Sequence, residues 1–486
     1  MKILEVNNID LPGRSFNGYD MIEELSNNEF SIKQAVIIKQ SNNNNVVNLF
    51  NEYVGDKAAA LKKLEDEISV HNLISINGEL LENLKEYKEA DIIHFHMFHN
   101  TNLPIPCLKK ISMKKHVVIT IHDPWFITGR CVHFYECNKW QNGCKNCEYL
   151  DTLFQLKEDN CNKLWAIKKE VINNSNIDLI VSSKWMQDCV NSSPITQNKN
   201  VYLIPFGVDL NKFNDNKNKA ELRKRYKIPN DNIVFFLRAQ NEFKGTKYVL
   251  EAIKKLNIDK KLTFITCNEV GLLDEVKNKY QIIDLGYIKE NEIIDAMNAC
   301  DVFLMTSKAE SFGMMAIEAM ACSRPVIIFN NTAMPSVTFA PDCGYIVEDK
   351  NSNELANAMI DLIKNKDERE RRGKLGRELC EKYYSKDTYN NKIKNTYREI
   401  VTHDLTKKTH LNIDKSKVKK IYLSINNGLK EKLYNNINIF DLNIDEINKL
   451  NNMLYKSSKP KITHRIKAFF INYFAKKMKG LILWNI

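Results

Sequence analysis

The chain has 486 residues, too many for one ordinary domain and enough for two with an extension. Its formal net charge of +11 suits phosphates, anionic lipid or nucleic acid, without choosing among them. The first residues are typical of a strand, since Glu5 stands where the apolar core of a signal peptide would continue, and no stretch is apolar enough to span a bilayer. We therefore expect a cytoplasmic protein, soluble or peripheral at the inner face of the membrane.

Short β-branched runs alternate with helical patterns through the first half, which is typical of a parallel sheet covered by helices. After the opening segment, the expected strands are Ala35–Ile38, Ile92–Phe95, Val117–Ile121, Leu179–Ser182 and Val201–Ile204. The segment Pro205-Phe206-Gly207-Val208-Asp209 then leads into a polar stretch that reaches Pro229, and this change marks a domain boundary. We predict a Rossmann-like N-terminal domain over residues 1–208.

The second half repeats the alternation. The expected strands are Val234–Leu237, Leu262–Thr266, Gln281–Leu285, Val302–Met305, Pro325–Phe329 and Tyr345–Val347, and the clearest helices are Tyr248–Leu256, Glu292–Asn298, Ser352–Lys364 and Asp367–Tyr384. We predict a second Rossmann-like domain over residues 209–400 and an extension over residues 401–486. Two such α/β domains in tandem face a cleft, where ligands bind at the carboxyl ends of the strands.

Two glutamates mark the candidate donor site. Glu310 precedes an apolar helix that we expect to begin with Ser311 as its N-cap, and Glu318 lies inside that helix, where a lone carboxylate needs a partner. Eight helical residues rise about 12 Å, roughly the span from a sugar across a diphosphate to a ribose. Between the glutamates, the backbone N–H groups of Phe312, Gly313 and Met314 suit a phosphate. The alternative is a helix-start carboxylate and a satisfied core group.

Two basic residues follow the strand Val234–Leu237. Arg238 ends it and Lys244 stands in the next loop, so both should lie at the carboxyl edge of the second sheet. Two cations neutralise a leaving diphosphate through charge-assisted hydrogen bonds without a divalent metal. The alternative is an ordinary solvated basic loop.

These motifs together resemble the GT-B glycosyltransferases of family 4, over roughly residues 1–400. The segments that carry the resemblance are Ile204-Pro205-Phe206-Gly207-Val208-Asp209, Arg238 with Lys244-Gly245, Leu285-Gly286-Tyr287, and Glu310 with Glu318 followed by Arg324-Pro325-Val326. The resemblance implies retention of anomeric configuration. It assigns ribose binding to Glu318, a donor-sugar contact to Glu310, diphosphate binding to Arg238 and Lys244, and the nucleobase to Tyr287 and Ile288.

The sequence departs from the family pattern at two places. Ser323 stands where the family has glycine, and the family's Gly-Gly…Glu loop is replaced by Asn331-Thr332-Ala333-Met334-Pro335-Ser336. We therefore infer no donor identity.

On the acceptor side, the strand Val117–Ile121 leads into His122 and Asp123. A histidine at this strand end suits a hydrogen bond to a sugar hydroxyl or a phosphate, and the resemblance implies that it contacts the donor. Asp123 is expected to orient the acceptor; the alternative is a His–Asp pair that stabilises the loop. His96 and His99 carry a weaker version of the same signal, and Gly13 and Gly18 are expected to allow close approach of substrate.

Four cysteines, Cys131, Cys137, Cys144 and Cys147, lie in one short segment. Only the last two have a C-x-x-C spacing, so this is no standard zinc ribbon, yet four thiolates can close a structural zinc site. The alternative is reduced cysteines that pack. The block from His122 to Cys147 resembles exopolysaccharide glycosyltransferases of the colanic acid type.

In the extension, a basic amphipathic helix is expected over residues 461–479, which suits an anionic membrane surface or docking on the enzyme body. We predict a retaining, metal-independent hexosyltransferase that moves a sugar from a nucleoside-diphosphate sugar to a glycan or lipid-linked acceptor in cell-surface polysaccharide synthesis. No catalytic cofactor and no nucleic acid partner are expected. The alternatives are a nucleotide-sugar epimerase of the same fold and a non-catalytic binding protein.

Overall fold

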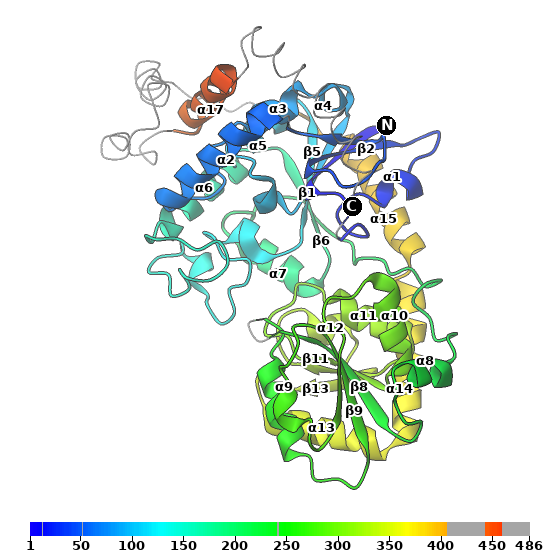
Figure 1. Cartoon of the computed structure of the whole chain (residues 1–486). Helices are drawn as coiled ribbons and strands as arrows, with labels where there is room; N and C mark the ends of the chain where they lie inside the picture. Colours follow the sequence, from blue (N-terminus) through cyan, green and yellow to red (C-terminus); the bar gives the residue numbers. More distant parts are fainter. Residues whose placement is uncertain (12, 51, 241–242, 406–442, 459–486) are drawn as a thin grey trace, which may run out of the picture.

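The computed structural model describes residues 1–11, 13–50, 52–240, 243–405 and 443–458. Its first sheet has seven parallel strands in the order β3-β2-β1-β4-β5-β6-β7 (Figure 1). The strands are β1 (Lys2–Ile9), β2 (Ser31–Ile38), β3 (Val46–Asn48), β4 (Ile92–His96), β5 (His116–Ile121), β6 (Ile177–Val181) and β7 (Val201–Leu203). The main helices between them are α1 (Met21–Glu24), α2 (Glu52–Glu67), α3 (Asn77–Asn83), α4 (Lys85–Glu89), α5 (Cys107–Ser112), α6 (Cys161–Asn173) and α7 (Lys184–Ser192).

The second sheet has six parallel strands in the order β10-β9-β8-β11-β12-β13. They are β8 (Ile233–Ala239), β9 (Leu262–Asn268), β10 (Gln281–Asp284), β11 (Val302–Met305), β12 (Val326–Phe329) and β13 (Gly344–Val347). The helices are α8 (Lys219–Arg225), α9 (Thr246–Lys255), α10 (Glu290–Ala299), α11 (Met314–Ala321), α12 (Met334–Val337), α13 (Ser352–Lys364) and α14 (Lys366–Tyr383). The predicted fold of two Rossmann-like α/β domains is confirmed.

The strand order explains where a ligand binds. In each sheet the order reverses beside the first strand of the domain, between β1 and β4 and between β8 and β11. Helices that leave neighbouring strands at this point cross to opposite faces of the sheet, so a crevice opens at the strands' carboxyl ends. Strands β4, β11 and β12 are buried along their whole length, as expected for a parallel sheet covered on both faces.

Helix α15 (Lys386–Ile400) returns from the second domain to the first (Figure 1). Lys386 forms ion pairs with Asp20, at 3.3 Å, and with Glu24 of α1, while Tyr397 is fully buried beside Glu5 of β1. From sequence, residues 386–400 were predicted to belong to the second domain, because helix periodicity does not show which sheet a helix packs on. Through these contacts, helix α15 connects the second domain to the first.

Part of the extension packs on the first domain. Helix α17 (Ile444–Ser458) lies beside α3, and Ile447 and Leu450 are buried in the core of the N-terminal domain. The basic amphipathic helix expected over residues 461–479 lies outside the described residues. Within the described part of the chain, no helix combines the length and the apolar character needed to cross a membrane.

Candidate functional site

The candidate donor site lies at the carboxyl ends of β8 and β11, where α11 begins. The expected N-cap at Ser311 is wrong: α11 starts at Met314, and Gly313 precedes it in the left-handed conformation with φ of 85°. A Cβ atom on Gly313 would lie 2.6 Å from the sulfur of Met334, so this tight turn against α12 requires glycine. The turn delays the helix by two residues and leaves Ser311 outside it.

The turn leaves backbone donors free at the start of α11. The N–H groups of Phe312, Gly313 and Met314 donate to none of the described residues. The Phe312 side chain is buried and meets the rings of Phe206 and Tyr384 edge to face at 5.4 and 5.5 Å. Phe312 therefore anchors the turn with its ring, while its backbone belongs to a group of donors that suits an anion.

Glu318 lies on the second turn of α11 and is half-buried. Its carboxylate makes no hydrogen bond or ion pair with any described residue. Burial and repulsion from Glu290 raise its pKa to about 7, although Arg238 opposes them. Arg238 is exposed at the end of β8. A carboxylate held in this way is ready to accept hydrogen bonds from a ligand, because it loses few protein contacts when the ligand arrives.

Glu310 and Lys244 form an ion pair across the loops that follow β11 and β8. Burial disfavours the Glu310 carboxylate, but the Lys244 ammonium outweighs it and holds the pKa of Glu310 below its usual range. The family resemblance implies a donor-sugar contact for Glu310 and diphosphate binding for Lys244. The structure instead brings them together, so a bound diphosphate would share Lys244 with Glu310.

Tyr287 and Ile288 follow β10 at the far side of the same edge. The Tyr287 ring is 88% exposed, whereas Ile288 is half-buried against the domain core. An aromatic ring this exposed next to a binding edge offers a face on which a flat ligand group can stack.

On the opposite domain, His122 directly follows β5 and lies in an aromatic cluster. Its ring stacks on Phe206 with 5.3 Å between centroids, and its Nε2 atom lies 3.2 Å from Nδ1 of His96. Burial, together with the neighbouring histidines, lowers the pKa of His122 well below its usual range. Because Phe206 also contacts Phe312, a continuous row of rings joins His122 to the start of α11.

The remaining acceptor-side residues have structural partners. Asp123 caps a 3₁₀ helix through the N–H of Trp125 at 2.9 Å, and its other oxygen lies 3.5 Å from His99, so its contacts match the loop-stabilising alternative. Gly13 is exposed on the loop after β1. Gly18 is buried, and a Cβ there would lie 2.8 Å from Cβ of Glu5. Gly18 therefore makes room for Glu5, and the close approach of substrate at this glycine stays a prediction.

The four predicted cysteines gather around one cavity of about 20 Å³, and a fifth, Cys161 at the start of α6, joins them. The thiols of Cys131 and Cys161 lie close enough to donate to Cys147, and these contacts hold the pKa of Cys147 below its usual range. Among the described residues, only Glu5, His94 and His96 place three possible metal ligands within 4.8 Å of one another. The sulfurs therefore surround the cavity more loosely than the tetrahedral Zn–S distance of about 2.3 Å demands. Cys161 was missed because it stands well beyond the C-x-x-C pair.

The cysteine segment also reaches the donor domain. The ring of His133 lies 5.6 Å from that of Phe243, and Glu136 forms an ion pair with Lys350. Burial lowers the pKa of His133, which lies close enough to Glu310 and Lys244 for their charges to act on it. His133 is a candidate donor-site residue that sequence reasoning missed, because only the folded segment brings it across the cleft.

Comparison with protein families gives one match at the donor domain. Residues 218–379 match the family of glycosyl transferases group 1. This chain contains a group 1 glycosyl transferase domain. The matched range holds Arg238, Lys244, Glu310 and Glu318, so the candidate donor site and the family domain coincide.

Individual relatives agree with this domain. The chain is 31% identical to an uncharacterized glycosyltransferase of Methanocaldococcus jannaschii over 31% of its own length and 44% of the relative's. It is 22% identical to a protein of Escherichia coli K12 named as a colanic acid biosynthesis glycosyl transferase, WcaC, over 51% and 61% of the two chains. The chain thus spans about half the length of these relatives.

The fold is that of solved GT-B glycosyltransferases. Anabaena HepE, whose crystal structure contains UDP and glucose, superposes with a TM-score of 0.56 at 17% identity, over 82% of this chain and 99% of HepE. At this identity the likeness shows the fold alone.

Proposed function

We propose that this protein transfers a sugar from a nucleoside-diphosphate sugar to a hydroxyl of a glycan or lipid-linked acceptor, with retention of anomeric configuration. The observation that carries the proposal is Glu318, a half-buried carboxylate with no hydrogen-bond or ion-pair partner among the described residues. It lies beside exposed Arg238 within a group 1 glycosyl transferase domain. Carboxylates bind vicinal hydroxyls well, and a buried one without a partner is costly unless a ligand uses it.

The other residues of the site then take separate parts of the donor. Arg238 and Lys244 neutralise the diphosphate, helped by the free N–H groups at the start of α11. Glu318 accepts hydrogen bonds from the ribose, Glu310 and His122 position the sugar, and the exposed ring of Tyr287 stacks on the base beside Ile288. Retention rests on the family resemblance.

The reaction needs no group beyond the two substrates. The acceptor oxygen forms a bond to C1 of the sugar as the bond from C1 to the β-phosphate oxygen breaks. The hydroxyl proton passes to that departing oxygen on the same face of the sugar. Arg238 and Lys244 stabilise the negative charge that develops on the diphosphate, and this stabilisation is the largest contribution we assign to the protein. We propose no covalent nucleophile and no divalent metal.

The names of relatives support a role in cell-surface polysaccharide synthesis, since one is named for colanic acid biosynthesis. HepE binds UDP and glucose, which makes uridine-linked sugars the first donors to test. An anionic membrane surface as a partner, and a position at the inner face of the membrane, rest on the sequence of residues 461–479 alone.

A panel of nucleoside-diphosphate sugars, incubated with the full chain, tests the proposal. We expect release of the nucleoside diphosphate from at least one donor, and much weaker donor binding by Glu318→Ala. Interconversion of donor sugars without release of the diphosphate would favour the epimerase instead. Full affinity for the donor in the Glu318→Ala variant would refute the assignment of Glu318.

We also propose that the cysteine segment binds a structural zinc. The support is five thiols around a cavity with room for about one water-sized particle, one of which, Cys147, has a pKa lowered by contacts with Cys131 and Cys161. Zinc would draw the sulfurs inward within a segment built of turns. About one zinc per chain, retained through gel filtration and reduced by Cys147→Ser, would support the site. Metal-free protein prepared without chelators would refute it.

A further inference from the structure

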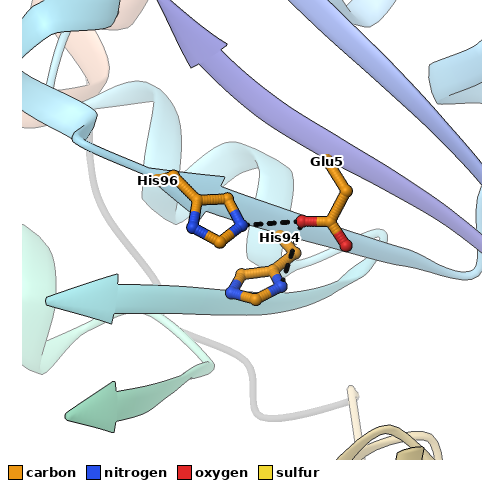
Figure 2. Close-up of side chains that lie close together, drawn as sticks. All are labelled: Glu5, His94 and His96. Carbon is orange, nitrogen blue, oxygen red and sulfur yellow. Dashed lines mark hydrogen bonds and ion pairs between the residues drawn. The ribbon is translucent and has the colours of Figure 1, made fainter. Parts of the chain in front are cut away.

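A buried hydrogen-bonded network lies directly behind His122. Glu5 on β1, His94 and His96 on β4, and Tyr397 on α15 are all fully buried. His96 Nε2 lies 2.8 Å from Glu5 Oε2, and His94 Nδ1 lies 3.2 Å from the same oxygen (Figure 2). The hydroxyl of Tyr397 donates to Glu5 Oε1 at 2.8 Å. The network thus joins three elements of the structure at a single carboxylate.

The carboxylate fixes the direction of the hydrogen bonds. Burial disfavours the charge on Glu5, but His94 and His96 outweigh it and lower the pKa of Glu5 to about 2, so this group is ionised at neutral pH. An ionised carboxylate only accepts hydrogen bonds, so Nε2 of His96 must carry a proton. Burial and the neighbouring His94 lower the pKa of His96 to about 4, which leaves its Nδ1 atom unprotonated.

The direction continues to the cleft. The unprotonated Nδ1 of His96 lies 3.2 Å from Nε2 of His122 and can only accept, so Nε2 of His122 donates to it. His122 is also neutral, because its pKa lies well below the usual range. Its second nitrogen, Nδ1, therefore keeps a lone pair, and no described residue donates to it.

We propose that Glu5 and His96 are positioning residues, which hold His122 as the Nε2–H tautomer and so make its Nδ1 an acceptor for a sugar hydroxyl. The diphosphate of a nucleotide sugar is esterified at both ends and carries no proton to donate at neutral pH, so this tautomer selects a hydroxyl and not that diphosphate. The choice of a sugar as the ligand rests on the proposed function. The assignment of the tautomer does not depend on the proposed function.

Neighbouring residues are shaped around this network. Gly18 lies against Glu5, where a Cβ would come within 2.9 Å of Oε2, so glycine keeps the carboxylate in place. Thr120 on β5 lies 2.7 Å from Nε2 of His94. Tyr397 comes from the helix that returns from the donor domain, and the network is therefore complete only when α15 is docked.

A metal ion is the competing occupant, since Glu5, His94 and His96 place ligand atoms within 4.8 Å of one another. The separations of 2.6 Å between Tyr397 and His94 and 2.8 Å between His96 and Glu5 are hydrogen-bond distances. Each of these polar atoms already has a partner of matching type, so the cluster is satisfied without an ion.

Nitrogen-15 NMR of the full chain, labelled at histidine, tests the proposal without needing a substrate. We expect His122 to carry its proton on Nε2 and to show an unprotonated Nδ1 at pH 7.5. In Glu5→Gln, whose side-chain amide can donate to His96, we expect the His122 tautomer to change. Glu65→Gln, at another buried carboxylate of the same domain, is the matched control and should leave His122 unchanged.

Activity provides the second measurement. For a donor that the enzyme uses, deoxygenation at the hydroxyl bound by His122 should lower kcat/KM about tenfold in the wild type, the weight of one hydrogen bond, and hardly at all in Glu5→Gln. A wild-type His122 protonated on Nδ1, a tautomer unaffected by Glu5→Gln, or zinc-induced changes in the His94 and His96 signals would each overturn the proposal. If the wild type turns over no donor but His122 shows the expected tautomer, the proposed function is refuted and the proposal about Glu5 and His96 is not.

Discussion

Replacement of Glu318 by glutamine should stabilise the unliganded protein while it weakens nucleotide binding. The folded protein raises the pKa of Glu318 to about 7, above the ordinary glutamate value of about 4.3. Between these two values the folded state binds the proton more tightly than the unfolded state does. Stability is therefore lost as the pH rises through this window, and the full penalty is present above pH 7.

The magnitude follows from the shift. A shift of this size corresponds to roughly 3.5 kcal/mol, which we reduce to about 2 kcal/mol because solvent reaches the half-buried carboxylate. For a domain of this size, the Glu318→Gln variant should melt roughly 4–8 °C higher than the wild type at pH 8.5. At pH 4.5, where the wild-type carboxyl is protonated, the two proteins should melt together.

Thermal denaturation with and without UDP measures both effects in one experiment. Without nucleotide at pH 8.5, the variant should melt at a higher temperature than the wild type. Saturating UDP should then raise the melting temperature of the variant by less than it raises that of the wild type. The reason is that the variant loses a charged hydrogen bond to the ribose, so its affinity for UDP falls about 10- to 100-fold. Glu275→Gln, at an exposed carboxylate of the same domain, serves as the control. The measured quantity is the difference in melting temperature between Glu318→Gln and the wild type. If this difference is no larger at pH 8.5 than at pH 4.5, the reasoning about Glu318 is refuted.

Three further predictions concern neighbouring features. Arg238→Ala should weaken binding of a nucleoside diphosphate about tenfold or more in calorimetry and leave binding of the free nucleoside unchanged, because Arg238 is proposed to contact only the phosphates. Equal losses of affinity for the two ligands would contradict this role of Arg238. Gly313→Ala should lower the melting temperature and abolish nucleotide binding, because the added Cβ would collide with Met334 and a φ of 85° disfavours alanine. A melting temperature equal to that of the wild type would argue against the left-handed turn at Gly313. Removal of residues 459–486 should reduce co-sedimentation with anionic liposomes and not with neutral ones, and undiminished binding to anionic liposomes would remove the membrane proposal.

The sequence predicted the two sheets because their strands are short, β-branched and separated by helical patterns. It also indicated which residues gather at the donor edge, since Arg238, Lys244, Glu310 and Glu318 all follow strands or a helix whose direction the alternation fixes. The start of α11 was misplaced because serine is a good N-cap in isolation, whereas Met334 packs so closely that only a left-handed glycine fits.

Other contacts depend on how distant segments fold together. Helical periodicity alone did not show that α15 returns to the first domain and places Tyr397 on Glu5. The contact of Gly18 with Glu5 could not be foreseen, because the two residues are remote in the chain. The same limit applies to Cys161 and His133, whose partners lie in other loops or in the other domain.

The account's central claim is that the edge formed by β8, β11 and α11 binds a nucleoside-diphosphate sugar for transfer. The most direct measurement is release of nucleoside diphosphate by the purified full chain across a panel of such donors, with and without a glycan acceptor. We expect release from a particular donor, stimulated by acceptor and strongly reduced in Glu318→Ala. Failure to bind or consume any donor in the panel, or equal turnover by the Glu318→Ala variant, would contradict the claim.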